Sequence, residues 1–267
     1  MSANWLYQAE SSDELLQEVL LLEQNWQYVF SIKEIEEQLA AHVAYLKNID
    51  HSELNPTDRF YALLDVIFDE LAFSGPGMQT IPESSLANIS YCIMHRTGNY
   101  LSMSVVLAYL LKQLGFDASI AEVEEQIGLV IKLSNSELIV VDALSGGCEY
   151  LISSDDVRDS MTNEIATFAK PIPTDEIVKI LLTEQKIFML EEGFLEEALN
   201  CVETLMELLP EDPYERRDRG LVLQQLECDK WAKDDFDYFI KACPNDPMTM
   251  FLKMQMDDLH GQLETIH

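Results

Sequence analysis

The chain has 267 residues, 48% of them apolar, so it has room for two domains or for one domain with a repeat appendage. Its 48 acidic residues against 17 lysines and arginines give a formal charge of −31. Because so negative a surface repels phosphate backbones and anionic lipids, the composition argues against general nucleic-acid or membrane-surface binding. The simplest interpretation of the charge is a solvated acidic surface.

The cysteines and the N-terminal residues favour a cytoplasmic location. Five cysteines are scattered along the sequence without a CxxC pair, which is typical of a reducing compartment and gives no disulfide framework. The first ten residues have neither a basic start nor a long apolar run, and no later run approaches the length of a membrane span. We therefore expect a soluble, cytoplasmic protein that binds neither nucleic acid nor membrane.

The N-terminal part has the apolar periodicity of helices. Ser31 precedes Glu34 by three residues, the spacing of a capping box, and Pro56 is suited to the first turn of a helix. Helices are predicted over residues 12–27, 32–48 and 59–72, with a shorter one over 85–95.

A buried helix followed by strands is predicted for the middle of the chain. Tyr100 to Leu114 is apolar nearly all round, which is typical of a helix buried on most faces, and Gly115 is expected to cap its C-terminus. Short, β-branched-rich runs then predict an antiparallel meander with Asn135 in one turn, and Ser153 to Asp156 is expected to cap a short helix. The predicted strands are 118–123, 127–133, 138–141 and 149–152.

The C-terminal part contains a repeat of 34 residues. Pro-Glu-Asp-Pro at 210–213 returns as Pro-Asn-Asp-Pro at 244–247. At the same interval the apolar positions Ala198, Val202, Leu205, Met206 and Leu209 map onto Ala232, Phe236, Phe239, Ile240 and Cys243. A small residue early in one helix and a proline turn after it are the signature of tetratricopeptide repeats, which expose a groove for another polypeptide. Helices are predicted over 175–191, 194–209, 213–226, 229–243 and 247–263.

The order of these elements predicts an α+β protein in two parts. Residues 1–170 are expected to form a helical N-terminal extension and a core of the papain or transglutaminase type, because a buried helix followed by an antiparallel sheet is the order of that core. Residues 175–267 are expected to form an all-α module of two tetratricopeptide repeats and a capping helix. The segment Pro171 to Thr174 is the expected junction.

Four segments carry a resemblance to a known family. They are the helix-start segment 95–100, the helix end 114–116, Asp142-Ala-Leu-Ser-Gly-Gly147 and the repeat segment 210–221. On these residues the chain resembles the bacterial SirB-type family, in which a transglutaminase-like core precedes tetratricopeptide repeats. The resemblance covers almost the whole sequence and is weakest over the first 50 residues. The family name is associated with regulation of virulence gene expression.

The resemblance implies a core without its catalytic thiol. The cysteine position of catalytic transglutaminase-like cores falls on Tyr100, the histidine position on Gln126 or a near neighbour, and the acidic position on Asp142. A phenol with a pKa of about 10 is a poor nucleophile at neutral pH, and glutamine has no nitrogen that accepts a proton. Tyr100, Gln126 and Asp142 are therefore interpreted as relic positions, and we expect no catalytic residue, no enzyme activity and no cofactor.

One alternative site remains open in the sequence. Cys92 and His95 share a helical face at i, i+3, which allows a displaced cysteine-type amide hydrolase or transferase, although buried cysteine is commonly a small core residue. The pair is weaker as a metal site, because zinc takes three or four ligands. Ser145-Gly146-Gly147 lacks the lysine of a phosphate loop, so a tight turn is expected there.

The first helix of the second repeat carries the candidate partner-binding residues. First helices of such repeats line the concave face, and Arg216 and Arg219 at i, i+3 are spaced to clamp carboxylates of an acidic protein partner, with Tyr214 beside them. The alternative is internal pairing with Glu215, Asp218 and neighbouring acids, locking the repeat to the first domain. We expect a protein-interaction role, with regulation or chaperone-like holding of a partner as its possible forms.

Overall fold

The structure is a computed structural model, and it describes residues 12–27, 29–49, 53–77, 80–134, 137–153 and 169–264. The chain divides into two compact units, of which the first ends at Gln185 and the second begins at Lys186. The junction expected at 171–174 lies before this boundary, because the helix that begins at Thr174 belongs to the first unit for most of its length. The predicted α+β class is confirmed.

Helices form the beginning of the first unit. The predicted capping box is present, because Ser31 accepts from the Glu34 amide while the Glu34 side chain accepts from the Ser31 amide. Asn55 accepts from the Asp58 amide and so begins the third helix at Pro56, earlier than expected, and this helix continues into a π-helical turn. The elements are α1 (Ser12–Glu23), α2 (Ile32–Asn48), α3 (Pro56–Asp65) and η2 (Val66–Glu70).

The single short helix predicted over 85–95 is wrong. The structure has α4 (Glu83–Leu86) and then α5 (Ile89–His95), because the Asn88 side chain accepts from the Tyr91 amide and caps a new helix. Arg96, in the left-handed conformation with φ 58°, ends α5.

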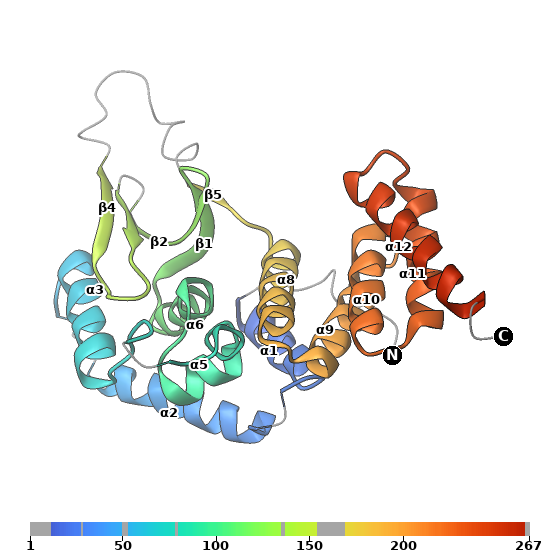
Figure 1. The fold of residues 1–267 in the computed structure, drawn as a ribbon. Helices are drawn as coiled ribbons and strands as arrows, with labels where there is room; N and C mark the ends of the chain where they lie inside the picture. Colours follow the sequence, from blue (N-terminus) through green and yellow to red (C-terminus); the bar gives the residue numbers. More distant parts are fainter. Residues whose placement is uncertain are drawn as a thin grey trace, which may run out of the picture. The chain divides into compact units, whose positions relative to one another are not determined.

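The predicted buried helix is confirmed as α6 (Tyr100–Gln113). Asn99 caps it by accepting from the Ser102 amide, and Gly115 follows its C-terminus with φ +88°, a conformation suited to glycine. α6 packs against α5 and against two strands of the sheet (Figure 1). This helix is therefore packed between other helices and the sheet.

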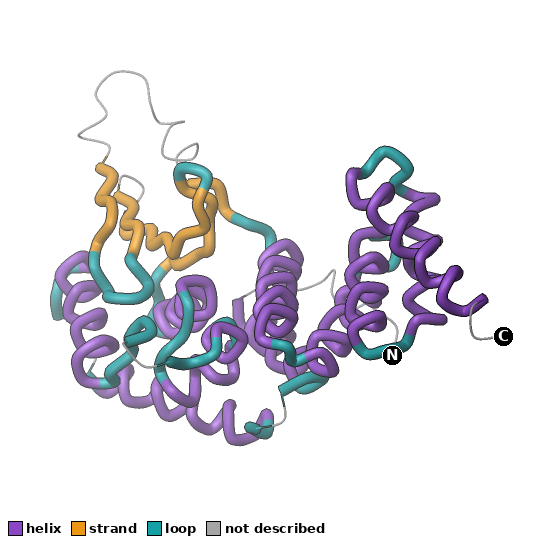
Figure 2. The backbone as a smooth tube through the Cα atoms, in the orientation of Figure 1, coloured by secondary structure: helices purple, strands orange, loops and turns teal. Residues whose placement is uncertain are grey.

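The predicted meander is confirmed, and one strand is added to it. The described strands are β1 (Asp117–Val123), β2 (Gln126–Ser134), β3 (Glu137–Val141), β4 (Cys148–Ser153) and β5 (Ala169–Pro171). They form one antiparallel sheet in the order β4-β3-β2-β1-β5. Figure 2 shows these strands in orange. β5 escaped prediction because it is short and ends in proline, which is tolerated at a sheet edge. The predictions for Asn135 and for a helix after Ser153 fall on residues outside those described.

The second unit is helical, as the repeat predicts. Its elements follow the end of α8 (Thr174–Glu192) and are α9 (Leu195–Leu208), α10 (Pro213–Gln225), α11 (Asp229–Ala242) and α12 (Pro247–Glu264). The repeating apolar positions Ala198, Val202, Leu205, Ala232, Phe236 and Phe239 are buried. Gly220 allows α10 and α11 to approach closely, because a Cβ there would lie 2.6 Å from the Phe236 ring. We call residues 186–264 the repeat module.

Candidate functional site

Tyr100 lies at the first position of α6, at the end of the sheet. Its hydroxyl donates to the Val141 carbonyl at 3.2 Å, which ties the helix start to the last residue of β3. Asn99, the cap of α6, also donates to a Glu184 carboxylate oxygen at 2.8 Å, and burial raises the pKa of Glu184. The phenol therefore has a structural hydrogen bond at the place where the resemblance puts a catalytic thiol.

A hollow opens beside Tyr100 at the hairpin that joins β1 to β2. Its volume is about 180 Å³, and the described residues that line it are Tyr100, Val123, Glu124, Gln126, Ile127, Gly128 and Val140. Gln126 is the first residue of β2 and pairs with Val123 across a two-residue turn. Two of the predicted positions, Tyr100 and Gln126, thus share one site, which we call the hollow. Glu124 and Gly128 were not predicted as site residues. A glycine inside a strand could have indicated this site, because such a glycine often marks a close approach of a ligand or another backbone.

Asp142 does not line the hollow. Its carboxylate accepts from the Leu144 amide at 2.9 Å and from the Ser145 hydroxyl, and its backbone bonds with Gly146 and Gly147 close a tight loop. Such side chain–backbone bonding is the ordinary role of aspartate in a turn. Ser145-Gly146-Gly147 accordingly forms the expected turn, and Asp142 stabilises it.

The geometry around Cys92 and His95 opposes their use as a dyad. The Cys92 thiol is fully buried and lies 3.5 Å from the Met103 sulfur, and burial raises its pKa to about 12. His95 is exposed instead, and its ring packs against Tyr91 and Phe30 with centroids 4.2 Å and 5.6 Å away. A thiol with so high a pKa has almost no thiolate at neutral pH, and thiolate is the nucleophile.

The arginines of α10 are engaged with acids of the same module. Arg219 forms a two-pronged bond with the buried Asp235 at 2.6 Å and 2.8 Å, and these bonds raise its pKa. Arg216 lies 3.7 Å from Asp235 and over the Tyr238 ring at 4.4 Å. The internal pairing foreseen as an alternative is therefore present, but Arg216 and Arg219 both pair with Asp235 of α11.

Tyr214 and Arg217 form a second cation–aromatic arrangement. The Arg217 guanidinium lies 5.1 Å from the centre of the Tyr214 ring and donates to Asp218 at 2.6 Å and 2.8 Å. The Tyr214 hydroxyl donates to Asp246 at 3.2 Å, although 43% of the residue stays exposed. Tyr214 thus combines a structural bond with a surface accessible to a partner.

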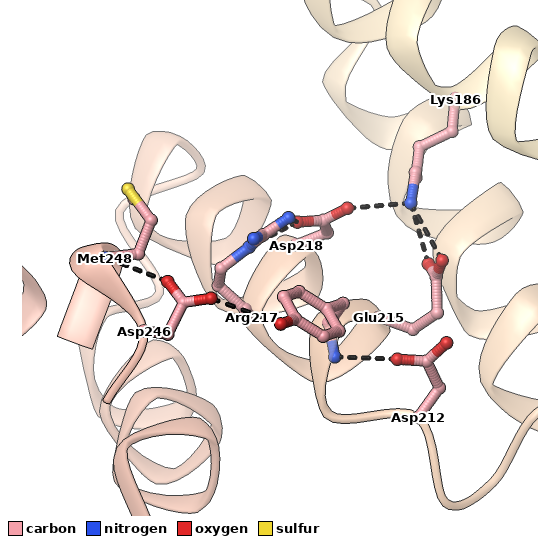
Figure 3. A network of polar contacts seen from close by, with 8 residues as sticks. Lys186, Asp212, Glu215, Arg217, Asp218, Asp246 and Met248 are labelled. Atoms are coloured by element: carbon pink, nitrogen blue, oxygen red, sulfur yellow. Dashed lines mark hydrogen bonds and ion pairs between the residues drawn. The ribbon is translucent and has the colours of Figure 1, made fainter. Parts of the chain in front are cut away.

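Lys186 is a buried member of the same network and lies at one side of it in Figure 3. Its ammonium donates to both oxygens of Glu215, at 3.0 Å and 2.8 Å, and to Asp218 at 2.7 Å. Burial opposes the charge, but the carboxylates of Asp218 and Glu215 outweigh it and raise the pKa of Lys186. A buried cation so fully paired is costly to remove, because the buried Glu215 carboxylate then loses its partner, whereas Asp218 keeps Arg217.

The first unit also contains a buried carboxylate that no sequence pattern singled out. Glu23, at the end of α1, accepts from the amides of Ile89 and Ser90, from the Ser90 hydroxyl and from the Gln185 side chain. Trp26 donates to the oxygen of the Gln185 amide at 3.0 Å. Burial raises the pKa of Glu23, while these donors oppose the rise. Glu23 therefore holds the start of α5 and the end of the first unit together.

Neither a membrane span nor a metal-binding cluster is found in the described part of the chain. None of the described helices is long and apolar enough to cross a membrane. The described residues also contain no group of three or more histidine, cysteine or acidic side chains that would hold a metal ion.

Comparison with known proteins gives two family matches. The boundary between the matched ranges lies close to the boundary between the two compact units. Residues 33–183 match the transglutaminase-like superfamily, and residues 185–257 match the tetratricopeptide repeat. A UPF0162 protein of Vibrio cholerae is 30% identical over 241 residues, which cover 85% of this chain and 88% of that relative. No solved structure matches the chain significantly.

Other relatives carry the name that the resemblance indicated. Protein SirB1 of Salmonella typhimurium is 27% identical over 179 residues, covering 64% of this chain and 65% of the relative. UPF0162 protein YchA of Escherichia coli is 28% identical over 182 residues, covering 66% of each. The fold and these matches define a transglutaminase-like protein with C-terminal tetratricopeptide repeats. The chain belongs to the SirB-type family of such proteins.

Proposed function

We propose that this protein is a non-catalytic interaction protein, in which the transglutaminase-like core supplies a scaffold and the repeat module recruits another polypeptide. The observation that carries the proposal is the identity of the residue at the start of α6. Tyr100 stands there with its hydroxyl bonded to Val141, and Gln126 is its polar neighbour in the hollow. Neither side chain supplies the thiolate or the imidazole base that thiol acyl transfer needs.

The rival proposal, a displaced amide hydrolase or transferase, depends on Cys92 and His95. Full burial and the high pKa of Cys92 count against it, and so does the separate environment of the His95 ring. The interaction role is favoured because it requires neither a reactive thiolate nor a catalytic base, and the described site supplies neither.

Within the repeat module, we propose that Tyr214 and Arg216 contact the partner. Tyr214 is 43% exposed, and the Arg216 side chain is 35% exposed with a long contact of 3.7 Å to Asp235. Arg219 is assigned a different task, because its two short bonds to the buried Asp235 stabilise the packing of α10 on α11. An acidic peptide or the terminal carboxylate of a polypeptide is the chemistry that Arg216 would recognise.

Capture of proteins from the native cytosol tests this proposal. The full-length protein is compared with a Tyr214→Ala/Arg216→Glu variant and with Lys241→Glu, a matched charge reversal at an exposed position of α11. We expect one protein in stoichiometric amount with the wild type and with Lys241→Glu, and its loss with the double variant. Equal recovery by both variants, with unchanged melting temperatures, would contradict the assignment of Tyr214 and Arg216. Absence of any partner would contradict the interaction role.

A further inference from the structure

Several of the residues that line the hollow beside Tyr100 share one face of the sheet. Side chains alternate along a strand, and the β1–β2 pairing places Val123 and Gln126 opposite each other and Gly128 opposite Ala121. Val123, Gln126 and Gly128 therefore point to the same face. A volume of about 180 Å³ has room for several water molecules, or for the end of a long amino acid side chain.

Gly128 lines the hollow without a side chain. Its backbone is outside the left-handed region, so its conformation does not require glycine. A Cβ at this position would lie 3.4 Å from Val140, 3.6 Å from Val123 and 3.9 Å from the Tyr100 hydroxyl, all ordinary contact distances. Packing therefore does not require glycine either. A glycine inside a strand is typical of a place that a ligand or another backbone approaches closely.

Glu124 lines the hollow from a turn whose backbone conformation is unfavourable for glutamate. Glu124 and Glu125 have φ of 49° and 67°, the positive values of a type I′ hairpin turn, for which asparagine followed by glycine is preferred. The presence of two glutamates there favours a use for a carboxylate at the rim, because strained conformations concentrate at functional sites.

The lining is suited to a planar cation. It includes Glu124, Gln126 and Tyr100, whose side chains carry a carboxylate, an amide and an aromatic ring, and no basic residue is among the described residues that line it. The repeat module contains an example of a guanidinium held by a tyrosine ring and a carboxylate, because Arg217 lies over the Tyr214 ring while donating to Asp218.

We propose that the hollow binds a guanidinium group, presented by an arginine side chain. The guanidinium would donate to the Glu124 carboxylate and the Gln126 amide oxygen and lie against the Tyr100 ring. Guanidinium suits these groups better than ammonium, because it is planar, weakly hydrated and able to bond a carboxylate through two nitrogens while stacking on a ring. The hollow belongs to the first unit, whereas Tyr214 and Arg216 belong to the repeat module, so failure here would leave the proposed role of the module untouched.

Titration of the full-length protein with capped amino acids tests the proposal. The probes are Nα-acetyl-arginine methylamide, the matching citrulline compound, which has the same shape without the charge, and the matching lysine compound. Free arginine is a fourth probe, which distinguishes a residue within a polypeptide from the free amino acid. Binding is followed by NMR on protein with ¹³C-labelled tyrosine, in which the Tyr100 signal is assigned by its loss in Tyr100→Phe.

We expect the capped arginine to shift the Tyr100 signal saturably and to bind at least about tenfold more tightly than the lysine compound, with no shift from citrulline. Glu124→Gln and Gly128→Ala should each weaken arginine binding about tenfold. Glu122→Gln, which removes the same charge from the opposite face of β1, should leave binding unchanged. An equal shift with citrulline, unchanged affinity in folded Glu124→Gln, or no saturation below about 50 mM would overturn the proposal.

Discussion

The repeat module and the hollow bring together the same kinds of groups, but only the module supplies its own cations. Arg216 lies over Tyr238 and near Asp235, and Lys186 lies between two carboxylates. In the hollow, Tyr100 and Glu124 line a space with no basic side chain among its described residues. Lys186 and Arg219 therefore stabilise the fold of the module, whereas we propose that the hollow receives its cation from another molecule.

The largest effect is expected from the most buried cation. Lys186→Met leaves the buried Glu215 carboxylate without its partner, while Asp218 keeps its bonds from Arg217. Breaking a buried pair from one side costs about 3 to 5 kcal/mol of unfolding free energy. Chemical denaturation measures the loss, with Lys241→Met as the exposed control. Adding Glu215→Gln should recover part of it, since that change removes one unpaired charge. A loss below about 1 kcal/mol would mean that the module does not depend on its internal cation.

A somewhat smaller effect is expected at the buried carboxylate of the first unit. Glu23→Gln turns one acceptor oxygen into a donor that faces donors of Ile89 or Ser90, at a cost of about 2 to 3 kcal/mol. Glu36→Gln, an exposed change on α2, should cost almost nothing in the same denaturation experiment.

The pH dependence of that variant gives a second readout. The folded-state pKa of Glu23 is raised above its ordinary value of 4.5, so the folded protein holds its proton more tightly than the unfolded chain does. The contribution of Glu23 to stability is thus greatest below pH 4.5 and declines as pH rises from there. The difference in unfolding free energy between wild type and Glu23→Gln should therefore shrink from pH 4.5 upward, and a growing difference would contradict this assignment.

Substitution of Arg216 and of Arg219 in α10 should reduce stability by different amounts, because their contacts to Asp235 differ in length. Arg219→Lys loses one of two short bonds to the buried Asp235 and should cost about 1 to 2 kcal/mol. Arg216→Lys, whose contact to Asp235 is 3.7 Å long, should cost about 0.5 kcal/mol or less. Thermal unfolding of the two variants side by side decides this. Equal losses would mean that Arg216 is as structural as Arg219 and a poor candidate for partner contact.

The smallest expected effect on the unfolding free energy is a stabilisation rather than a loss. Glu124→Asn with Glu125→Gly gives the hairpin its preferred turn residues and should raise the unfolding free energy by about 1 kcal/mol. The same change removes the Glu124 carboxylate and should weaken binding of capped arginine at least about tenfold. A stabilised variant that binds as tightly as the wild type would show that the Glu124 side chain is not used.

Much of the fold was predictable because its signals are local. The capping box at Ser31, the all-round apolar run from Tyr100 and the 34-residue spacing of buried positions such as Phe236 each depend on neighbouring residues or on a simple repeat. The site was less predictable because it depends on contacts between distant segments. The bond from Tyr100 to Val141 and the donors around Glu23 join segments that no spacing rule connects.

Some details could not be predicted, for identifiable physical reasons. The resemblance places the acidic position at Asp142 but does not reveal that its carboxylate accepts from the Leu144 amide in a tight loop. Asp235 was not foreseen as the partner of Arg216 and Arg219, because it comes from the next helix rather than from the acids beside them.

Alkylation of individual cysteines tests whether this transglutaminase-like core operates without thiol chemistry. Native protein is treated with iodoacetamide at about pH 7, and the modification rate of each cysteine is followed by peptide mass spectrometry. Exposed Cys148 serves as the internal reference, while Cys92 is fully buried with a pKa of about 12. We expect Cys92 to be modified at least about a hundredfold more slowly than Cys148. Modification of Cys92 faster than Cys148 in folded protein would contradict the non-catalytic assignment and would favour a displaced catalytic thiol.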